Sequence, residues 1–179
     1  MIDTPGHPRL RARAVAKHLA ASTHAVLLID STTGLTVKNI RTAADSLHML
    51  LGLRSFLPTL QPLSLLVLLT KADHAPVLIE RARLTLGREM ERRRQAALTG
   101  GSSNRIEGLA AEDGPSAAKG GPLPTDENEI MQADIWGDKP WSWDQELDLG
   151  GVQVSWATAH LSKANGAQQV YQWAAAAQA

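Results

Sequence analysis

Short apolar runs alternate with helical patterns along most of the chain. Residues 25–30 (AVLLID) and 63–69 (LSLLVLL) are almost wholly apolar, which is typical of strands buried on both faces of a parallel sheet. Residues 152–156 form a weaker third run of this kind. Apolar residues recur at helical spacing in four other stretches, namely 8–21, 40–51, 76–98 and 167–177. The alternation predicts an α/β fold with a mainly parallel sheet and flanking helices.

One long stretch interrupts this alternation. Residues 99–133 contain two Gly-rich clusters, scattered acidic residues and few large apolar side chains, so little buried surface would offset the entropy of ordering them. The third apolar run follows this stretch and completes the alternation. We therefore expect a single domain over residues 1–179, with a disordered insertion at about 99–135, rather than two domains joined by a linker.

The amino-acid composition of the chain argues against several classes of protein. Eighteen Lys and Arg residues balance 18 Asp and Glu residues, which argues against a protein that binds nucleic acid or a membrane surface through bulk charge. The absence of cysteine excludes disulfides and thiolate metal sites, and a cytosolic setting fits it. No apolar run approaches the roughly 18 residues of a membrane helix, and the N-terminus lacks the apolar core of a signal peptide.

The first candidate site is the D-x-P-G-H sequence that begins at Asp3. A carboxylate at a strand end holds Mg²⁺ through water in nucleotide switches, and the adjacent glycine lets a backbone N–H approach the γ-phosphate. A polar side chain after that glycine positions the attacking water. Asp3, Gly6 and His7 fit these three roles. The alternative is an ordinary turn, since D-T-P-G is a common turn tetrapeptide.

The second candidate is Thr70-Lys71-Ala72-Asp73, which directly follows the run 63–69. The Asp73 carboxylate would accept hydrogen bonds from guanine N1–H and the exocyclic amine, a pair of donors that adenine does not offer. The Lys71 stem would pack over the base, and Thr70 would tie the loop to its neighbours. Open α/β sheets bind ligands at the carboxyl ends of their strands. The alternative is a helix start capped by Asp73.

A third, weaker candidate follows the last apolar run. Thr158 and Ala159 form a loop of small residues in which a backbone N–H would reach the guanine O6. Taken alone, this loop is better explained by ordinary structure. Three such motifs in this order, each after a predicted strand, are far more specific than any one of them.

Together these motifs resemble the β subunit of the signal recognition particle receptor, a small GTPase. The resemblance rests on residues 2–11 (IDTPGHPRLR), 26–31 (VLLIDS) and 70–73 (TKAD), and on an aromatic and apolar segment with Trp141 and Trp143. It runs over the whole chain except the insertion. Two residues depart from the family pattern: Thr70 stands where asparagine is common, and His160 replaces a lysine.

The resemblance implies a P-loop small-GTPase fold that binds GTP and Mg²⁺. Asp3, Gly6, Thr70, Lys71, Asp73, Thr158 and Ala159 would be binding residues, with Asp3 on Mg²⁺ through water and His7 positioning water. It also implies the receptor α subunit as partner, with the ribosome or translocon as further partners, no direct DNA binding, and a place at the cytosolic face of the endoplasmic reticulum membrane.

No G-x-x-x-x-G-K-[ST] phosphate loop occurs in the chain. The fold is therefore expected to be incomplete, a truncated GTPase domain whose anchor, phosphate loop and central strand lie upstream. That central strand would lie between a strand ending at Asp3 and the strand 25–30, so the chain alone is expected to be inactive.

Two other readings of the function stay open. One is a fragment of a translational GTPase, since those factors also carry D-x-P-G-H. The other is a nucleotide-free interaction module with a GTPase-like fold.

Two surface features also have alternative interpretations. The arginines between residues 88 and 94 form either a solvated helix face, with Glu89 paired to Arg93, or a contact for ribosomal RNA or lipid headgroups. Trp136, Trp141 and Trp143 either pack the returning segment onto the core or form a partner surface.

Overall fold

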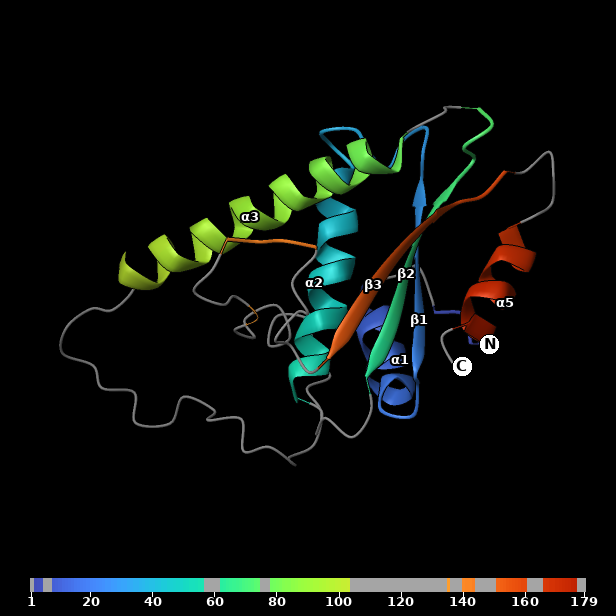
Figure 1. The fold of residues 1–179 in the computed structure, drawn as a ribbon. Coiled ribbons are helices and arrows are strands. Elements are labelled where there is room, and N and C mark those ends of the chain that lie inside the picture. Colours follow the sequence, from blue (N-terminus) through green and yellow to red (C-terminus); the bar gives the residue numbers. More distant parts are fainter. Residues whose placement is uncertain are drawn as a thin grey trace.

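The computed structural model describes residues 2–4, 8–56, 62–74, 78–103, 135, 140–143, 151–160 and 166–176. Three parallel strands form its sheet in the order β1-β2-β3 (Figure 1). They are β1 (His24–Asp30), β2 (Leu63–Thr70) and β3 (Val152–Thr158). The register aligns Asp30 with Thr70 and Leu69 with Thr158. The carboxyl ends of all three strands therefore lie at one edge of the sheet.

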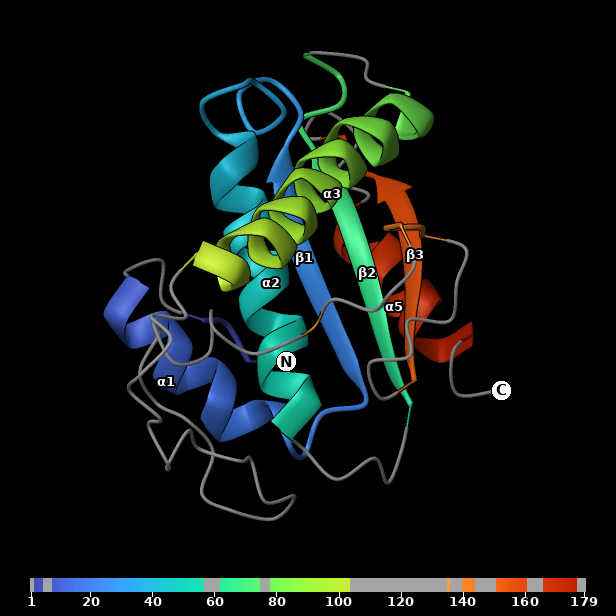
Figure 2. The same cartoon turned by 90° about the vertical axis from the view of Figure 1, so that its left-hand side faces the viewer.

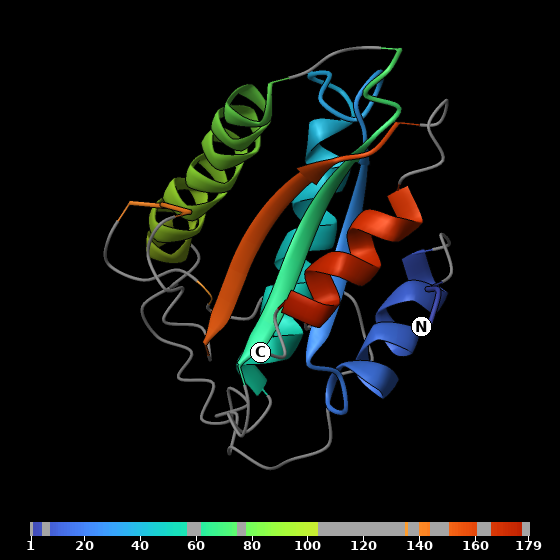
Figure 3. The ribbon, with the colours of Figure 1, turned by 45° about the vertical axis from the view of Figure 1, so that its right-hand side comes forward.

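Helices cover the two faces of the sheet unequally. The helices are α1 (Pro8–Leu19), α2 (Ile40–Phe56), α3 (Ile79–Ser103) and α5 (Gly166–Ala176). Helices α2 and α3 lie on one face and α5 on the other, and α1 packs against α2 (Figures 1 and 3). Leu63, Leu65, Val67 and Leu69 of β2 belong to the larger core, whereas Leu66 and Leu68 face α5. Strand β2 is thus buried on both faces, as its apolar run predicts.

The predicted α/β class with a parallel sheet is confirmed, and most element bounds differ by only a few residues. Strand β3 continues to Thr158, two residues beyond the predicted run, and α2 continues to Phe56. Helix α3 runs through Ser103, five residues into the predicted insertion, and Ile135 near the other end of that stretch is 3% exposed. The predicted insertion otherwise falls on residues 104–134, which lie outside the described residues.

The strand expected to end at Asp3 is not observed, and that prediction is wrong. Residues 2–4 have no strand structure and are exposed. A strand needs a neighbour for its backbone N–H and C=O groups, and within the described residues β1 pairs with β2 alone. On the face of β1 turned toward the α5 side, Val26 is 37% and Leu28 is 63% exposed. The outer edge and one face of β1 are therefore uncovered in the described part of the chain.

Tryptophan side chains pack the segment 140–143 between α3 and β3. The Trp141 and Trp143 rings meet edge to face at 5.3 Å, and Trp143 meets Trp156 of β3 in the same way at 5.1 Å. The Trp143 Nε1–H donates to the Arg83 carbonyl of α3 over 2.9 Å. The predicted packing of Trp141 and Trp143 onto the core is confirmed, whereas Trp136 lies outside the described residues. These contacts tie α3 to β3 on the face of the sheet that α2 also covers (Figure 2).

Charged side chains hold the same segment and the helix pair α2 and α3. The Trp141 N–H donates to Glu91 over 2.8 Å, and Glu91 also pairs with Arg94 at 2.9 Å. The predicted pair of Glu89 with Arg93 is confirmed at 3.2 Å, and Arg93 continues to Asp45 of α2 at 2.7 Å. Most arginines of this cluster therefore form ion pairs within the folded structure.

Acid should weaken the Glu91 contacts. The Arg94 guanidinium, and after it the Trp141 N–H, lower the pKa of Glu91 from 4.5 to about 2. Because the folded pKa lies below the unfolded one, this stabilisation is complete above about pH 4.5 and is lost as pH falls toward 2. We expect a Glu91→Gln variant to lose roughly 1–2 kcal/mol at neutral pH, after allowance for partial exposure.

The measurement is denaturant unfolding between pH 7 and pH 2. The Glu91→Gln curve should fall less steeply below pH 4.5 than that of the unaltered chain. Glu80→Gln, which changes an exposed carboxylate of the same helix, serves as the matched control. Parallel pH curves for the unaltered chain and Glu91→Gln would contradict the assigned contacts.

Candidate functional site at the carboxyl edge of the sheet

Backbone hydrogen bonds join the three strand ends into one rigid edge. The Ser31 N–H donates to the Thr70 carbonyl over 2.9 Å, which ties the loop after β1 to the end of β2. The Ala159 N–H donates to the Leu69 carbonyl over 2.8 Å, and the Ala72 N–H donates to the Ala159 carbonyl over 3.1 Å. Ligands of open α/β sheets bind at this edge. The carboxyl edge is therefore the candidate ligand site of this fold.

An ion pair crosses this edge from the end of β2 to the end of β1. Lys71 Nζ lies 2.6 Å from Asp30 Oδ2, with side-chain exposures of 44% for Lys71 and 27% for Asp30. The other carboxylate oxygen, Oδ1, accepts the Thr32 N–H over 2.8 Å and the Thr32 hydroxyl over 2.5 Å. The Lys71 ammonium, followed by the Thr32 hydroxyl and N–H, holds the pKa of Asp30 well below its usual range. Asp30 is thus a fixed anion that orients Lys71.

Lys71 has a left-handed backbone with φ of 56°, the one non-glycine residue with positive φ in the described part of the chain. This conformation costs a non-glycine residue on the order of 1 kcal/mol and persists where surrounding contacts hold it. Residues in such conformations gather at functional sites. The ion pair to Asp30 and the bond from Ala72 to Ala159 hold Lys71 from both sides.

The turn after β1 has no space for a side chain at Gly34. The Gly34 N–H donates to the Asp30 carbonyl over 2.7 Å. A Cβ atom on Gly34 would lie 2.6 Å from that oxygen and 2.8 Å from Ile29 Cγ2. Glycine is therefore needed to close the turn that presents the Asp30 carboxylate and the Thr32 and Thr33 amides.

The structure brings together five of the predicted site residues. Thr70 ends β2, Lys71 and Asp73 follow it, and Thr158 and Ala159 end the neighbouring strand. The Thr70 hydroxyl donates to the Ile29 carbonyl over 3.4 Å, and Asp73 lies exposed on its loop. The Ala159 N–H, expected to face a ligand, is bonded to Leu69. A ligand contact with that N–H would require this bond to be shared or broken.

Segment 2–4, the described part of the first motif, does not lie at this edge. The N-terminal end of the chain, with segment 2–4, lies beside the lower half of the sheet in Figures 1 and 2, whereas the carboxyl ends of the strands are at the top. Asp3 therefore stands apart from Lys71 and Asp73. Gly6 and His7 lie outside the described residues, so their predicted roles stay predictions.

The described residues contain neither a cluster of metal ligands nor a helix that could span a membrane. That part of the chain holds no group of three or more His, Asp or Glu side chains arranged for a metal ion. The predicted role of Asp3 at Mg²⁺ therefore stays a prediction. None of the described helices combines the length and apolar character that crossing a bilayer requires.

Sequence reasoning gave Asp30 no role, although the structure makes it the partner of Lys71. The signal was present, because an acidic residue ends a buried apolar run and is followed by Ser31, two threonines and Gly34. Carboxylates followed by such residues favour turns in which the side chain accepts backbone N–H groups. What the sequence did not reveal is that Asp30 and Lys71, 41 positions apart, meet across the edge.

The left-handed backbone at Lys71 yields a direct test. Both Lys71→Ala and Lys71→Gly remove the ion pair to Asp30, but only glycine adopts positive φ without strain. We expect the glycine variant to be more stable than the alanine variant by roughly 1 kcal/mol, the reverse of the order at ordinary positions. Urea unfolding of the two variants measures the difference. Greater stability of the alanine variant would show that Lys71 does not have this conformation.

Comparison with protein-family models, with curated proteins and with solved structures found no match to this chain.

Proposed function

We propose that the carboxyl edge of the sheet binds a guanine nucleotide, and that the chain is a GTP-binding protein of the signal recognition particle receptor β type. The observation that carries the proposal is the arrangement around Lys71. The Thr70–Asp73 sequence directly follows the buried central strand, its lysine is held left-handed by Asp30, and the loop of Thr158 and Ala159 lies beside it. The residues that the proposal assigns to the base thus lie in adjacent loops.

In this proposal each residue has a separate part. The Asp73 carboxylate accepts two hydrogen bonds from guanine, and the aliphatic stem of Lys71 covers the base while Asp30 holds its ammonium. Thr158 and Ala159 line the far side of the base. Asp3, Gly6 and His7 would act at the phosphates, Asp3 on Mg²⁺ through water and His7 on the attacking water. This part of the proposal requires segment 2–4 to lie at the carboxyl edge, where this structure does not have it. When bound, Mg²⁺ would neutralise phosphate charge.

The cellular role follows from the resemblance and belongs to the same proposal. The GTP-bound chain would dock the receptor α subunit and so recruit it to the cytosolic face of the endoplasmic reticulum, with the ribosome or translocon as further contacts. Nucleotide would then act as a switch for docking more than as the substrate of a fast hydrolase.

A second candidate is a nucleotide-free interaction module with this fold. Two observations favour it: Lys71 Nζ is engaged by Asp30, and the Ala159 N–H is engaged by Leu69. The chain also has no G-x-x-x-x-G-K-[ST] sequence, where backbone N–H groups and a lysine would bind phosphates. The two candidates make different predictions for nucleotide titrations.

The test is a titration with fluorescent GTP, for the chain as given and for the chain extended by the coding sequence upstream of Met1. We expect weak binding to the chain alone, since it retains only base contacts, and tight Mg²⁺-dependent binding if the extension supplies a phosphate loop. Fluorescent ATP is the control ligand. No binding to either protein would favour the nucleotide-free module, and equal affinity for the two nucleotides would remove the assignment of guanine.

A further inference from the structure

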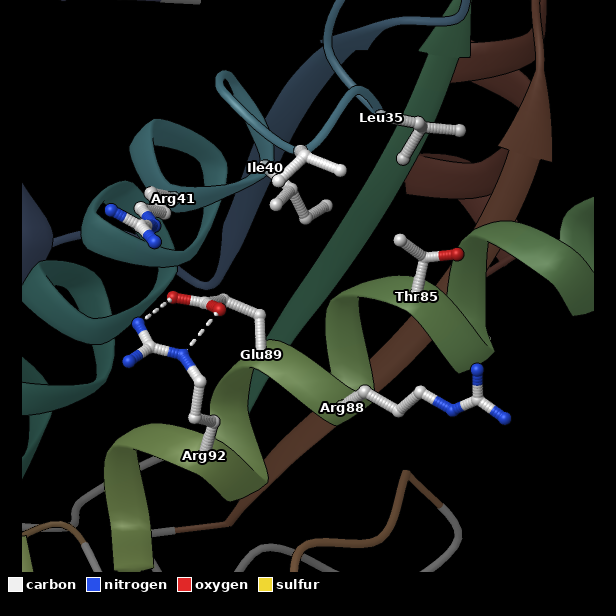
Figure 4. A pocket seen from close by; sticks show the side chains of 8 residues that line it. Leu35, Ile40, Arg41, Thr85, Arg88, Glu89 and Arg92 are labelled. Carbon is white, nitrogen blue, oxygen red and sulfur yellow. Dashed lines mark hydrogen bonds and ion pairs between the residues drawn. The ribbon is translucent and has the colours of Figure 1, made fainter. Parts of the chain in front are cut away.

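A groove of about 330 Å³ lies between α3 and the segment that links β1 to α2 (Figure 4). Leu35, Val37 and Ile40 form an apolar wall on the side of α2. Arg41 belongs to the same wall, and Arg88 and Arg92 come from α3. Val37 is 84% exposed, so a large apolar side chain stands open to solvent beside cationic ones.

The charges of the groove are unequal. Its lining contains three arginines and one carboxylate, that of Glu89. Arg92 binds Glu89 through two hydrogen bonds of 2.9 and 2.6 Å, so these two charges compensate each other. Arg41 and Arg88 are exposed, and no carboxylate of the described residues lies within ion-pair distance of either. The groove therefore carries two uncompensated positive charges beside apolar side chains.

The two walls are held in place relative to each other. Arg93 of α3 donates from Nη2 to the Arg41 carbonyl over 3.0 Å and pairs through Nη1 with Asp45 at 2.7 Å. Both contacts cross from α3 to the first turns of α2, directly beside the groove. A partner would thus meet a largely preformed surface and would not have to order it, which lowers the cost of binding.

We propose that this groove docks an acidic peptide segment of a partner protein, with an apolar side chain of the peptide on Val37 and Ile40 and carboxylates on Arg41 and Arg88. Arginine suits this role because its planar fork binds carboxylates in a bidentate manner. The apolar wall gains from burial of a hydrophobic side chain. The groove uses none of the residues proposed to contact nucleotide, although Leu35 and Val37 belong to the loop that follows the carboxyl end of β1.

The groove fits a peptide better than RNA or a membrane. It contains no aromatic side chain on which a base would stack, and stacking supplies much of the binding of single-stranded RNA. The chain as a whole has no net positive charge to draw it to phosphates or to anionic lipid. A concave surface with apolar side chains and two open arginines matches an amphipathic acidic segment.

The experiment measures fluorescence anisotropy of a labelled peptide of alternating glutamate and leucine, added to the full chain. The double variant Arg41→Glu/Arg88→Glu should bind it roughly tenfold more weakly, since each exposed pair is worth up to about 1 kcal/mol. Val37→Ser should also weaken binding. Arg81→Glu is the matched control, because Arg81 is an exposed arginine of α3 outside the groove. Denaturant unfolding checks that each variant keeps its fold.

Two further probes complete the test, poly-uridine RNA and vesicles of phosphatidylserine and phosphatidylcholine. Weaker binding of the peptide to the groove variants, with Arg81→Glu unchanged, would support the proposal. Equal peptide affinity for the groove variants and the control would overturn it. Tighter binding of the RNA or the vesicles than of the acidic peptide, lost in the double variant, would also overturn it.

Discussion

Trp143→Ala should lower the free energy of unfolding by roughly 3 kcal/mol, the largest effect we expect from a single substitution here. The Trp143 ring packs edge to face on Trp141 and Trp156, and its Nε1–H binds the Arg83 carbonyl. Truncation removes both ring contacts and the hydrogen bond from the indole to the α3 backbone. Urea unfolding followed by fluorescence of the remaining tryptophans measures the loss.

Gly87 provides the matching control for this contact. An added Cβ at Gly87 would lie 2.9 Å from Trp143 Nε1, so glycine in mid-helix makes room for the indole. Alanine would ordinarily stabilise a helix interior by about 1 kcal/mol over glycine. We expect Gly87→Ala to destabilise the unaltered chain but to stabilise the Trp143→Ala variant. A stabilising effect in both backgrounds would contradict the close approach of ring and helix.

Asp73→Asn should lower affinity for GTP roughly tenfold to hundredfold and admit xanthine nucleotides, in a protein extended upstream so that it binds phosphate. The carboxylate that accepts from guanine N1–H and its amine becomes an amide, and a hydrogen bond to a charged group is worth about 1.5–3 kcal/mol. The xanthine ring carries a carbonyl where guanine has its amine, and the new amide donates to it. Calorimetric titration with both nucleotides measures the exchange of preference.

Glu80→Gln is the control for this measurement, since it neutralises an exposed carboxylate in the first turn of α3, outside the loop. It should leave both affinities unchanged. Unaltered GTP affinity in the Asp73→Asn protein would remove Asp73 from the site, and with it the specific support for guanine. Denaturant unfolding of both variants checks that each keeps its fold.

The layers of the fold were predictable from sequence because the apolar runs indicate which segments are buried in the sheet. Strand β2 is apolar at almost every position and lies in the middle of the sheet, as continuous hydrophobicity predicts. Helix ends were less predictable. Gly100 and Gly101 indicated that α3 stops near residue 98, yet the helix continues to Ser103. Local propensity is a weak guide where a long helix is already formed and extension adds one bond per residue.

The site was predictable only in part. The sequence Thr70–Asp73 after a buried run marked the edge, and the register of β2 with β3 brings Thr158 beside it. The left-handed Lys71 and its bond to Asp30 were not predictable, because tertiary contacts across 41 positions impose them. The same holds for Gly87, whose need for glycine arises from Trp143. Contacts between distant segments leave no local pattern in sequence.

The parallel order β1-β2-β3 also constrains how the chain reaches this structure. The pairing of β2 with β3, such as Leu63 with Val152, closes about twice as many residues as the pairing of β1 with β2, such as His24 with Ser64. The longer closure costs only roughly 0.5–1 kcal/mol more in chain entropy, but contacts between distant residues form slowly. The unit β1-α2-β2 should therefore fold first. Strand β3 should dock last, so the β2 edge of the early two-stranded sheet stays open until it arrives.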